Sequence, residues 1–382
     1  DGTPWNADAL IANVNKWADK SLGLKRTTFL CNVLDHAEKI DDYTVKIYLS
    51  QSFGAFISNL AHPATLIMSP KQIEAGEDAC AQAPVGTGQY KFVEWVAGDH
   101  MKVELNKDWW GYDADVCGGT ALADADAGFK SITFKPVAES ATRVSAVQAG
   151  DAQIMWSVPT ESVDTLKGDS NVSVGMGDSI TVWYFFMNTQ KAPFNDVKVR
   201  EAMAYAINKE AYIQVVMNGY GSVATSMVGE AVQHYKGNDP YSYDPEKAKE
   251  LLKEAGYEDT DGDGIVEKDG EPLSLRLVFQ TEEYASWKSL CEFLKSEYEK
   301  VGVGVELVEK ESAAYYDEIW NTRDYDLCIY RSYEDSWMPH GFLKSMFYAE
   351  DGAKAVNWYD EELNKDLGEV LKTQDEEKRT EL

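Results

Sequence analysis

Several short segments in the first half of the chain alternate hydrophobic and polar residues with a period of two. Because successive side chains of a strand point to opposite faces, this pattern predicts half-buried β-strands. The segments concerned are residues 43–50, 101–105 and 132–137. Ser140 to Ala149 predicts a short helix that ends at Gly150, and Gln153 to Val158 predicts the next strand, ended by Pro159. Their order predicts a β-α-β unit.

Helical periodicity dominates the second half. Val197 to Met217 carries apolar residues on one face at 3.6 residues per turn, which predicts one helix. Asp244 before Pro245 predicts another helix start, because Asp caps free N–H groups and proline fits the first turn. The remaining predicted elements are strands over 273–279, 303–308 and 326–330, and helices around 287–294 and 313–320. Strands that alternate with helices predict a largely parallel sheet covered on both faces.

The boundary between two lobes is predicted near Gly175–Asp178, where glycines precede an aromatic strand. We expect residues 1–178 to form lobe I and residues 179–382 to form lobe II, with a hinge strand near 179–188. Both ends of the chain look truncated. We therefore expect the N-terminal part of lobe I and the return crossing from lobe II to lobe I to be missing.

The amino-acid composition limits the kinds of molecule that this protein can bind. The 382 residues contain 36 basic and 65 acidic side chains, a formal charge of −29, so nucleic acid is not expected to bind. A hydrophobic fraction of 44% predicts a folded protein. The five cysteines form no C-x-x-C pair, which predicts mostly buried thiols.

One acidic turn has features of a metal-binding loop. Asp259 to Gly264 resembles the start of a calcium loop, because alternate Asp residues can turn carboxylates toward one cation. Position twelve of that template is Gly270, and the nearby carboxylates of Glu267 and Asp269 are at the wrong spacing for an EF-hand. A solvated acidic turn and a calcium site at Asp259–Asp263 both stay open, and we expect no other cofactor.

The sequence lacks the motifs of common catalytic sites. It has no Gly-x-Ser-x-Gly, His-Glu-x-x-His or phosphate-binding Gly-rich loop, and its five histidines are far apart. This favours binding over catalysis. One alternative is a secreted glycan-acting hydrolase, which would need two carboxylates about 5 to 9 Å apart. Another is a purely structural surface protein.

Aromatic residues gather in two places that suit a ligand site. Trp183 to Phe186 are consecutive, so their rings point alternately to the two faces of a strand. Tyr330, Tyr333, Trp337 and Phe342 surround Glu334 and Asp335, directly after the strand at 326–330. In an open α/β sheet, ligands bind outside the carboxyl ends of the strands, where this loop would lie.

Four ordered stretches resemble the extracytoplasmic solute-binding proteins of ABC importers, in the large peptide- and nickel-binding class known as family 5. They are DGTPWNA from Asp1; APVGTGQY from Ala83 with NKDWWG from Asn106; Met187 to Asn208, which contains PFNDVKVREAMAYAIN; and YDPEKAKELL from Tyr243 with AGY from Ala255. Residues 330–343 and 367–371 resemble the nickel-binding branch most. The family extends beyond both ends of this chain, in agreement with the truncated appearance.

The resemblance implies a two-lobed α/β fold of the type II periplasmic-binding class, with mixed sheets and helices on both faces. It implies a non-enzymatic, monomeric protein outside the cytoplasm, anchored by lipid, that closes on its ligand and docks on a membrane permease. The ligand would be a small peptide, another amine-bearing solute or a nickel chelate. The implied site comprises Trp183, Tyr184, Tyr333, Asp335 and Trp337.

Two departures from the nickel-binding branch bear on the ligand. That branch holds the carboxylates of its ligand with an arginine near residues 62–68, and this chain has no arginine between Arg26 and Arg143. It also uses a histidine after Met346, where Asp351 and its neighbours stand here. In the peptide binders, an Asp at the position of Asp335 pairs with the amino group of the ligand, through a charge-assisted hydrogen bond.

Overall fold

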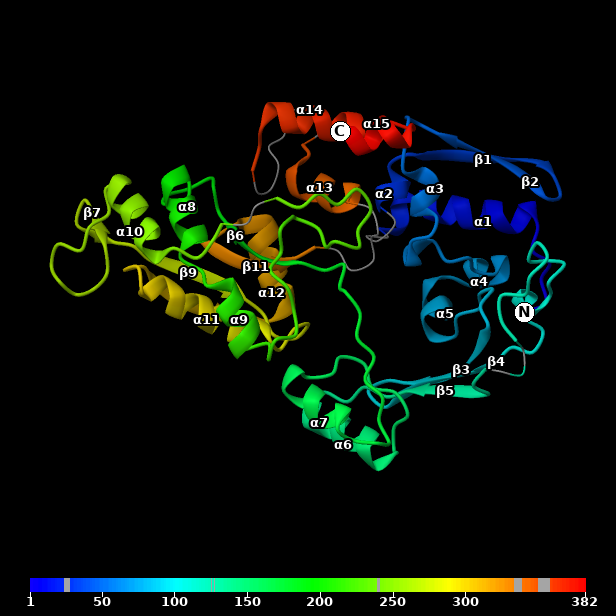
Figure 1. Ribbon diagram of the computed structural model, residues 1–382. Helices are drawn as coiled ribbons and strands as arrows, with labels where there is room; N and C mark the ends of the chain where they lie inside the picture. The colour runs from blue at the N-terminus through cyan, green and yellow to red at the C-terminus, as the bar shows by residue number, and fades with distance from the viewer. Residues whose placement is uncertain (24–27, 125, 127, 239–240, 333–338, 350–357) are drawn as a thin grey trace. The chain divides into compact units, whose positions relative to one another are not determined.

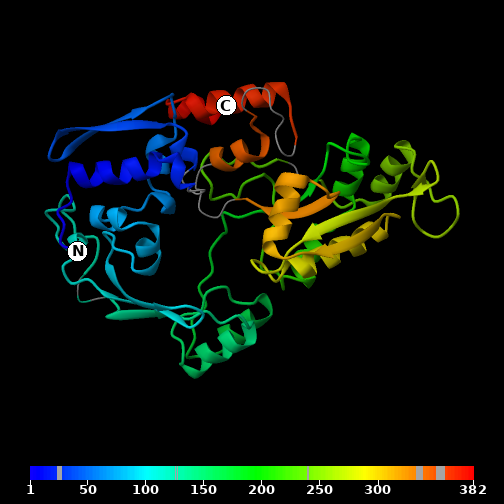
Figure 2. The same ribbon diagram turned by 180° about the vertical axis from the view of Figure 1, so that it is seen from behind.

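The computed structural model divides the chain into two compact units (Figures 1 and 2). It describes residues 1–23, 28–124, 126, 128–238, 241–332, 339–349 and 358–382. Unit 1 comprises Asp1–Ala152 and Val370–Glu381, and unit 2 comprises Gln153–Glu369 and Leu382. The expected lobes put residues 153–178 in the first lobe and residues 370–381 in the second. The observed units differ from the expectation at both places.

The described part of unit 1 contains mostly short helices and two antiparallel sheets. Its elements are α1 (Ala7–Ala18), η1 (Lys20–Leu22), α2 (Thr28–Cys31), β1 (Leu34–Asp41), β2 (Thr44–Leu49), α3 (Phe56–Asn59), η3 (Pro63–Thr65), α4 (Pro70–Ala75), α5 (Glu77–Gln82), β3 (Tyr90–Val96), β4 (His100–Leu105), η4 (Trp110–Tyr112), β5 (Ser131–Phe134), α6 (Ser140–Ala149) and α15 (Glu376–Glu381). Strands β1 and β2 form a hairpin, and β3, β4 and β5 form a three-stranded sheet. The predicted strands at 43–50, 101–105 and 132–137 and the helix over Ser140–Ala149 are confirmed.

The predicted strand over Gln153–Val158 is wrong. These residues form neither helix nor strand, so the β-α-β unit does not exist. The alternating pattern misled because no strand pairs with this segment. Its apolar side chains stay in solvent, with Ile154 72% and Trp156 88% exposed, and Ser157 has a left-handed φ of 58°.

Residues 370–381 join unit 1 through contacts with the loop before α3. The backbone N–H of Gly54 donates to Leu371 O at 2.9 Å, and Ser52 Oγ donates to Lys372 O at 2.7 Å. Arg379 Nη1 donates to Gly54 O at 2.9 Å. A Cβ atom on residue 54 would lie 1.7 Å from Thr373 O, so only glycine permits this approach.

The described part of unit 2 is built around a mixed four-stranded sheet, and β7 and β8 form a separate hairpin. Its elements are η5 (Thr160–Ser162), α7 (Val163–Lys167), β6 (Trp183–Met187), α8 (Val197–Tyr205), α9 (Lys209–Val215), α10 (Pro245–Glu254), β7 (Glu267–Lys268), β8 (Glu271–Pro272), β9 (Ser274–Phe279), α11 (Trp287–Glu299), β10 (Gly304–Glu309), α12 (Ser312–Asp317), the π-helix η6 (Glu318–Thr322), β11 (Leu327–Arg331), α13 (His340–Phe347) and α14 (Glu361–Lys372), which runs on into unit 1. The sheet order is β10-β9-β11-β6. Strands β10 and β11 run parallel to β9, whereas β6 runs antiparallel to β11.

Helices cover both faces of this sheet, as Figure 1 shows for α8 and α10 on one side and α11 on the other. The core joins Val199 and Met203 of α8, Leu252 of α10 and Leu294 of α11 to the strands, all of them almost fully buried. The predicted largely parallel sheet with two covered faces is confirmed, with β6 as its antiparallel edge strand. No helix in the described parts of the chain is long and apolar enough to cross a membrane.

The predicted ends were correct for one helix of unit 2 and wrong for another. The Asp244 side chain accepts from Lys247 N at 2.9 Å, and Gly256 has a φ of +90°, so both predicted ends of α10 are confirmed. The single helix predicted over residues 197–217 is instead two helices. Asn208 breaks it, because its side chain accepts from Ala211 N at 2.9 Å and caps α9.

We expect Gly54→Ala to release residues 370–381 from unit 1, because the added methyl group would overlap Thr373 O. Hydrogen exchange should show faster exchange of the α15 amides while the amides of α8 and α11 stay protected. Gly88→Ala is the matched control, since nothing lies within 4 Å of a Cβ placed there. Equal α15 protection in the two variants would contradict the assignment.

The cysteines differ sharply in burial. Cys31 is 6%, Cys291 0% and Cys328 1% exposed, whereas Cys80 and Cys117 are partly exposed. Burial also raises the pKa of the Cys291 and Cys328 thiols, which suppresses the reactive thiolate. This confirms the prediction of mostly buried thiols.

A thiol reagent such as a maleimide should therefore label Cys80 and Cys117 in the native protein within minutes. Cys291 and Cys328 should react only after denaturation. Peptide mapping by mass spectrometry would measure both. Equal labelling of Cys291 and Cys80 under native conditions would show that the core of unit 2 opens freely.

Candidate functional site

The best candidate site lies at the carboxyl edge of the sheet in unit 2. Strands β9 and β11 are parallel, so both end at this edge, and the antiparallel strand β6 begins there. Arg331, the last residue of β11, pairs with Trp183, the first residue of β6. The residues that follow β9 lead away from the same edge. We call the following residues the carboxyl-edge cluster: Trp183, Gln280, Glu283, Tyr284, Tyr316 and Arg331.

Aromatic rings line this cluster. The Tyr284 ring makes an edge contact with Trp183 at a centroid distance of 5.7 Å and stacks on Trp287 at 4.9 Å. The guanidinium carbon of Arg331 lies 5.6 Å from the centroid of the Tyr284 ring, within the range of a cation–π contact. The cluster therefore offers flat apolar surfaces next to a cation that is always charged.

Glu283 connects the loop after β9 to β11 and α12. Its two carboxylate oxygens lie 2.8 and 2.9 Å from the hydroxyl oxygen of Tyr316, which donates to them. Its Oε2 atom lies 3.8 Å from Nη2 of Arg331, an ion pair at the outer limit of contact. Its backbone N–H donates to Gln280 Oε1 at 3.0 Å. The carboxylate is thereby fixed between a neutral donor and a cation.

Gln280 supports the cluster through its hydrogen bond with the backbone of Glu283. Its side chain is fully buried, and its Nε2 atom has no hydrogen-bond partner among the described residues. Trp287 is also fully buried, and its Nε1 atom likewise lacks an acceptor there. Because a buried donor without an acceptor costs about 1–3 kcal/mol, the loop conformation that buries Gln280 must be held by its other contacts.

The structure separates the two predicted aromatic site residues on β6. Trp183 belongs to the carboxyl-edge cluster. Tyr184 lies on the opposite face, where it stacks with Phe186 at 5.5 Å and Phe342 at 5.8 Å and donates to Met227 O. Burial raises the pKa of its hydroxyl. Tyr184 is thus partly buried and packs against the core, and its part in ligand binding stays a prediction.

The other predicted site residues, Tyr333, Asp335 and Trp337, lie outside the described residues, so their roles also stay predictions. The sequence analysis missed Gln280, Glu283 and Tyr284. One signal could have found them, because they directly follow the predicted strand at 273–279. The argument from the carboxyl ends of strands was applied to the loop after 330 and applies equally to this loop.

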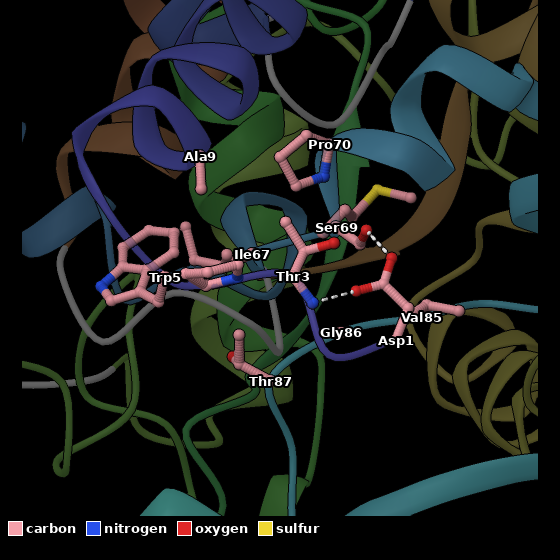
Figure 3. Close-up of a pocket in the computed structure, with 12 residues that line it drawn as sticks. Asp1, Thr3, Trp5, Ala9, Ile67, Ser69, Pro70, Val85, Gly86 and Thr87 are labelled. Carbon is pink, nitrogen blue, oxygen red and sulfur yellow. Dashed lines mark hydrogen bonds between the residues drawn. The ribbon is translucent and has the colours of Figure 1, made fainter.

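Unit 1 has a shallow pocket of its own (Figure 3), beside the turn at Val85–Thr87. Asp1 accepts from Thr3 N at 2.9 Å and from Ser69 Oγ at 2.5 Å at its rim. Asp1 is the only residue with a charged side chain among those that line it. The other lining residues offer a ligand mainly apolar contacts and hydroxyl groups.

The acidic turn does bring carboxylates together. Ligand oxygens of Asp259, Asp261, Asp263 and Glu267 all lie within 4.8 Å of one another. Glu267, which the EF-hand spacing excludes, reaches the group because Glu258 N donates to Glu267 O at 3.0 Å and folds the chain back. Backbone N–H groups already bind these oxygens, for example Gly262 N with Asp259 Oδ1 at 2.7 Å. A calcium site here stays a prediction.

The fold is that of the two-lobed α/β periplasmic-binding class. The chain belongs to the bacterial extracellular solute-binding proteins of family 5, since the model for the middle region of that family matches residues 1–354. The predicted family and fold class are thereby confirmed.

The proteins that this chain is similar to in sequence include the glutathione-binding protein GsiB of several bacteria. The protein from Escherichia coli K12 is 39% identical over 257 residues, which cover 67% of this chain and 48% of the relative. The protein from Salmonella typhimurium is 30% identical over 390 residues, which cover 100% of this chain and 71% of the relative. The chain thus spans about half the length of the first of these matches.

Solved structures share the fold at lower identity. They include AppA from Bacillus subtilis with a nonapeptide, at 24% identity and a TM-score of 0.77, covering 100% of this chain and 74% of that one. NikZ from Campylobacter jejuni with Ni(L-His) matches at 22% identity and a TM-score of 0.79, with the same coverage. At these identities the likeness shows the fold and leaves the ligand undetermined.

Proposed function

We propose that this protein is the substrate-binding component of an ABC import system and captures a short peptide or a related amine-bearing solute. It acts outside the cytoplasm as a lipid-anchored monomer and delivers its ligand to membrane permease subunits. Family membership over residues 1–354 carries the binding role. The same membership supports a role without catalysis, and no contact in the described cluster favours a hydrolase.

The chemistry of the carboxyl-edge cluster supports a peptide-like ligand. Arg331 can bind a carboxylate by charge-assisted hydrogen bonds, and the rings of Trp183 and Tyr284 suit apolar or planar groups such as peptide bonds. Asp335 would pair with the amino group, as the family resemblance implies. Glutathione, which appears in the names of curated relatives, is a tripeptide that has both groups, so it is the first ligand to test.

The nickel-chelate alternative rests on the names of structural neighbours and on the resemblance of residues 330–343 to the nickel-binding branch. The sequence departs from that branch at both of its ligand-holding positions. A nickel–histidine complex is therefore a competing ligand in the test.

Capture would work by a shift between open and closed arrangements of the two units. A ligand favours the closed state only through contacts that it makes there and not in the open state. To move the population from 1:99 to 99:1, these contacts must supply about 5.5 kcal/mol of differential affinity. No bond is made or broken, so the protein releases an unchanged solute.

We expect calorimetry to show binding of reduced glutathione or of an unmodified dipeptide such as Ala-Leu, and weaker binding of a nickel–histidine complex. Arg331→Gln should weaken peptide binding at least about tenfold, because a carboxylate loses its cationic partner. Lys288→Gln is the control, since Lys288 pairs with Glu309 at 3.3 Å on the surface. Nickel–histidine binding without peptide binding would overturn the peptide proposal.

Asp335→Asn should weaken binding of an amine-bearing ligand at least about tenfold, because the amide no longer supplies a negative charge to the ammonium group. Asp317→Asn is the control, since Asp317 accepts from its own helix neighbour Asn321 at 2.7 Å. Calorimetry with the same dipeptide measures both variants. Unchanged affinity in Asp335→Asn would remove this residue from the site.

A further inference from the structure

Glu283 occupies a position in the carboxyl-edge cluster that ligand recognition as described above does not explain. It is the anionic member of the cluster and lies 3.8 Å from the Arg331 guanidinium. Its side chain is 34% exposed and that of Arg331 is 18% exposed. This ion pair is thus partly exposed to solvent.

Hydrogen bonds hold both the carboxylate and the backbone of Glu283 in place. The Tyr316 hydroxyl lies within 2.9 Å of both its oxygens, from α12. The buried side chain of Gln280 accepts from its backbone N–H at 3.0 Å. Tyr316 and Gln280 therefore position Glu283 independently of its ion pair with Arg331. This suggests that its location beside that cation has a function.

Other charged side chains described near this edge make contacts of their own. Lys288 pairs with Glu309 at 3.3 Å, and Lys310 pairs with the nearly buried Glu318. Glu282, the residue that precedes Glu283, accepts from Ser312 N at 3.2 Å. Among the described residues of the cluster, the charged side chains are those of Arg331 and Glu283, one positive and one negative.

We propose that Glu283 is a specificity-determining residue that makes the site select zwitterionic ligands over anionic ones. This inference rests on the proposed function. A ligand carboxylate that approaches Arg331 also meets the carboxylate of Glu283, and two like charges at close range repel each other. A ligand ammonium group offsets that repulsion, whereas a second or uncompensated carboxylate does not.

The test compares three forms of one ligand by calorimetry at fixed ionic strength: Ala-Leu, its N-acetyl form and its C-terminal amide. Wild-type protein should bind Ala-Leu better than N-acetyl-Ala-Leu. Glu283→Gln should raise the affinity for the N-acetyl form relative to Ala-Leu at least about tenfold, because one negative charge beside Arg331 is then lost. Glu283→Asp keeps the charge and should keep the wild-type preference.

Glu282→Gln is the matched control, one residue away with the same charge change, and should leave the preference within about twofold of wild type. Tyr316→Phe removes the hydroxyl that fixes the carboxylate without a change in charge. It should shift the preference in the same direction as Glu283→Gln, but less. This second variant keeps the test decisive if Glu283→Gln fails to fold, as thermal unfolding would reveal.

The wild-type titrations and the variants answer different questions. If wild-type protein binds none of the three peptides, the proposed function fails. If wild-type protein binds them and the charge preference of Glu283→Gln equals that of Glu282→Gln, the proposed function stands and the role of Glu283 is overturned.

Discussion

The candidate site depends on the antiparallel pairing of β6 with β11. Backbone hydrogen bonds fix the register in which Arg331 faces Trp183. Because side chains alternate along a strand, a shift of one residue would exchange the faces of Trp183 and Tyr184 and bring Tyr184 to the face of the cluster. The apolar core below the sheet prevents such a shift, since Tyr184 already stacks with Phe186 and Phe342. Packing of the core thus decides which aromatic side chain the edge presents.

The sequence predicted the elements of the fold wherever one local signal acted alone. The cap at Asp244 and the alternation at 101–105 were enough, because each depends on neighbouring residues only. Residues 153–158 alternate just as well but lack a partner strand, and pairing is a long-range property that no local pattern contains. Asn208 shows the opposite case, in which a local side-chain bond interrupts a helix whose apolar face continues beyond it.

The site was less predictable than the fold, for a similar reason. Aromatic content drew attention to β6 and to the loop after β11. Glu283 and Gln280 carry no such signal, because acidic and amide residues are common on surfaces. Their significance comes from the parallel alignment of β9 with β11, which brings the residue after Phe279 to the same edge as Arg331. Only the order of the strands in the sheet reveals that neighbourhood.

The overall charge of −29 and the pair at the edge act over different distances. The field of the whole chain repels any anionic solute, but salt screens it with a Debye length of about 8 Å at physiological ionic strength. The repulsion between Glu283 and a bound carboxylate acts at contact, in a half-buried setting where screening is weak. A preference for zwitterions that arises from the global field should therefore fade as salt is added. One that arises from Glu283 should persist, so the salt dependence separates the two causes.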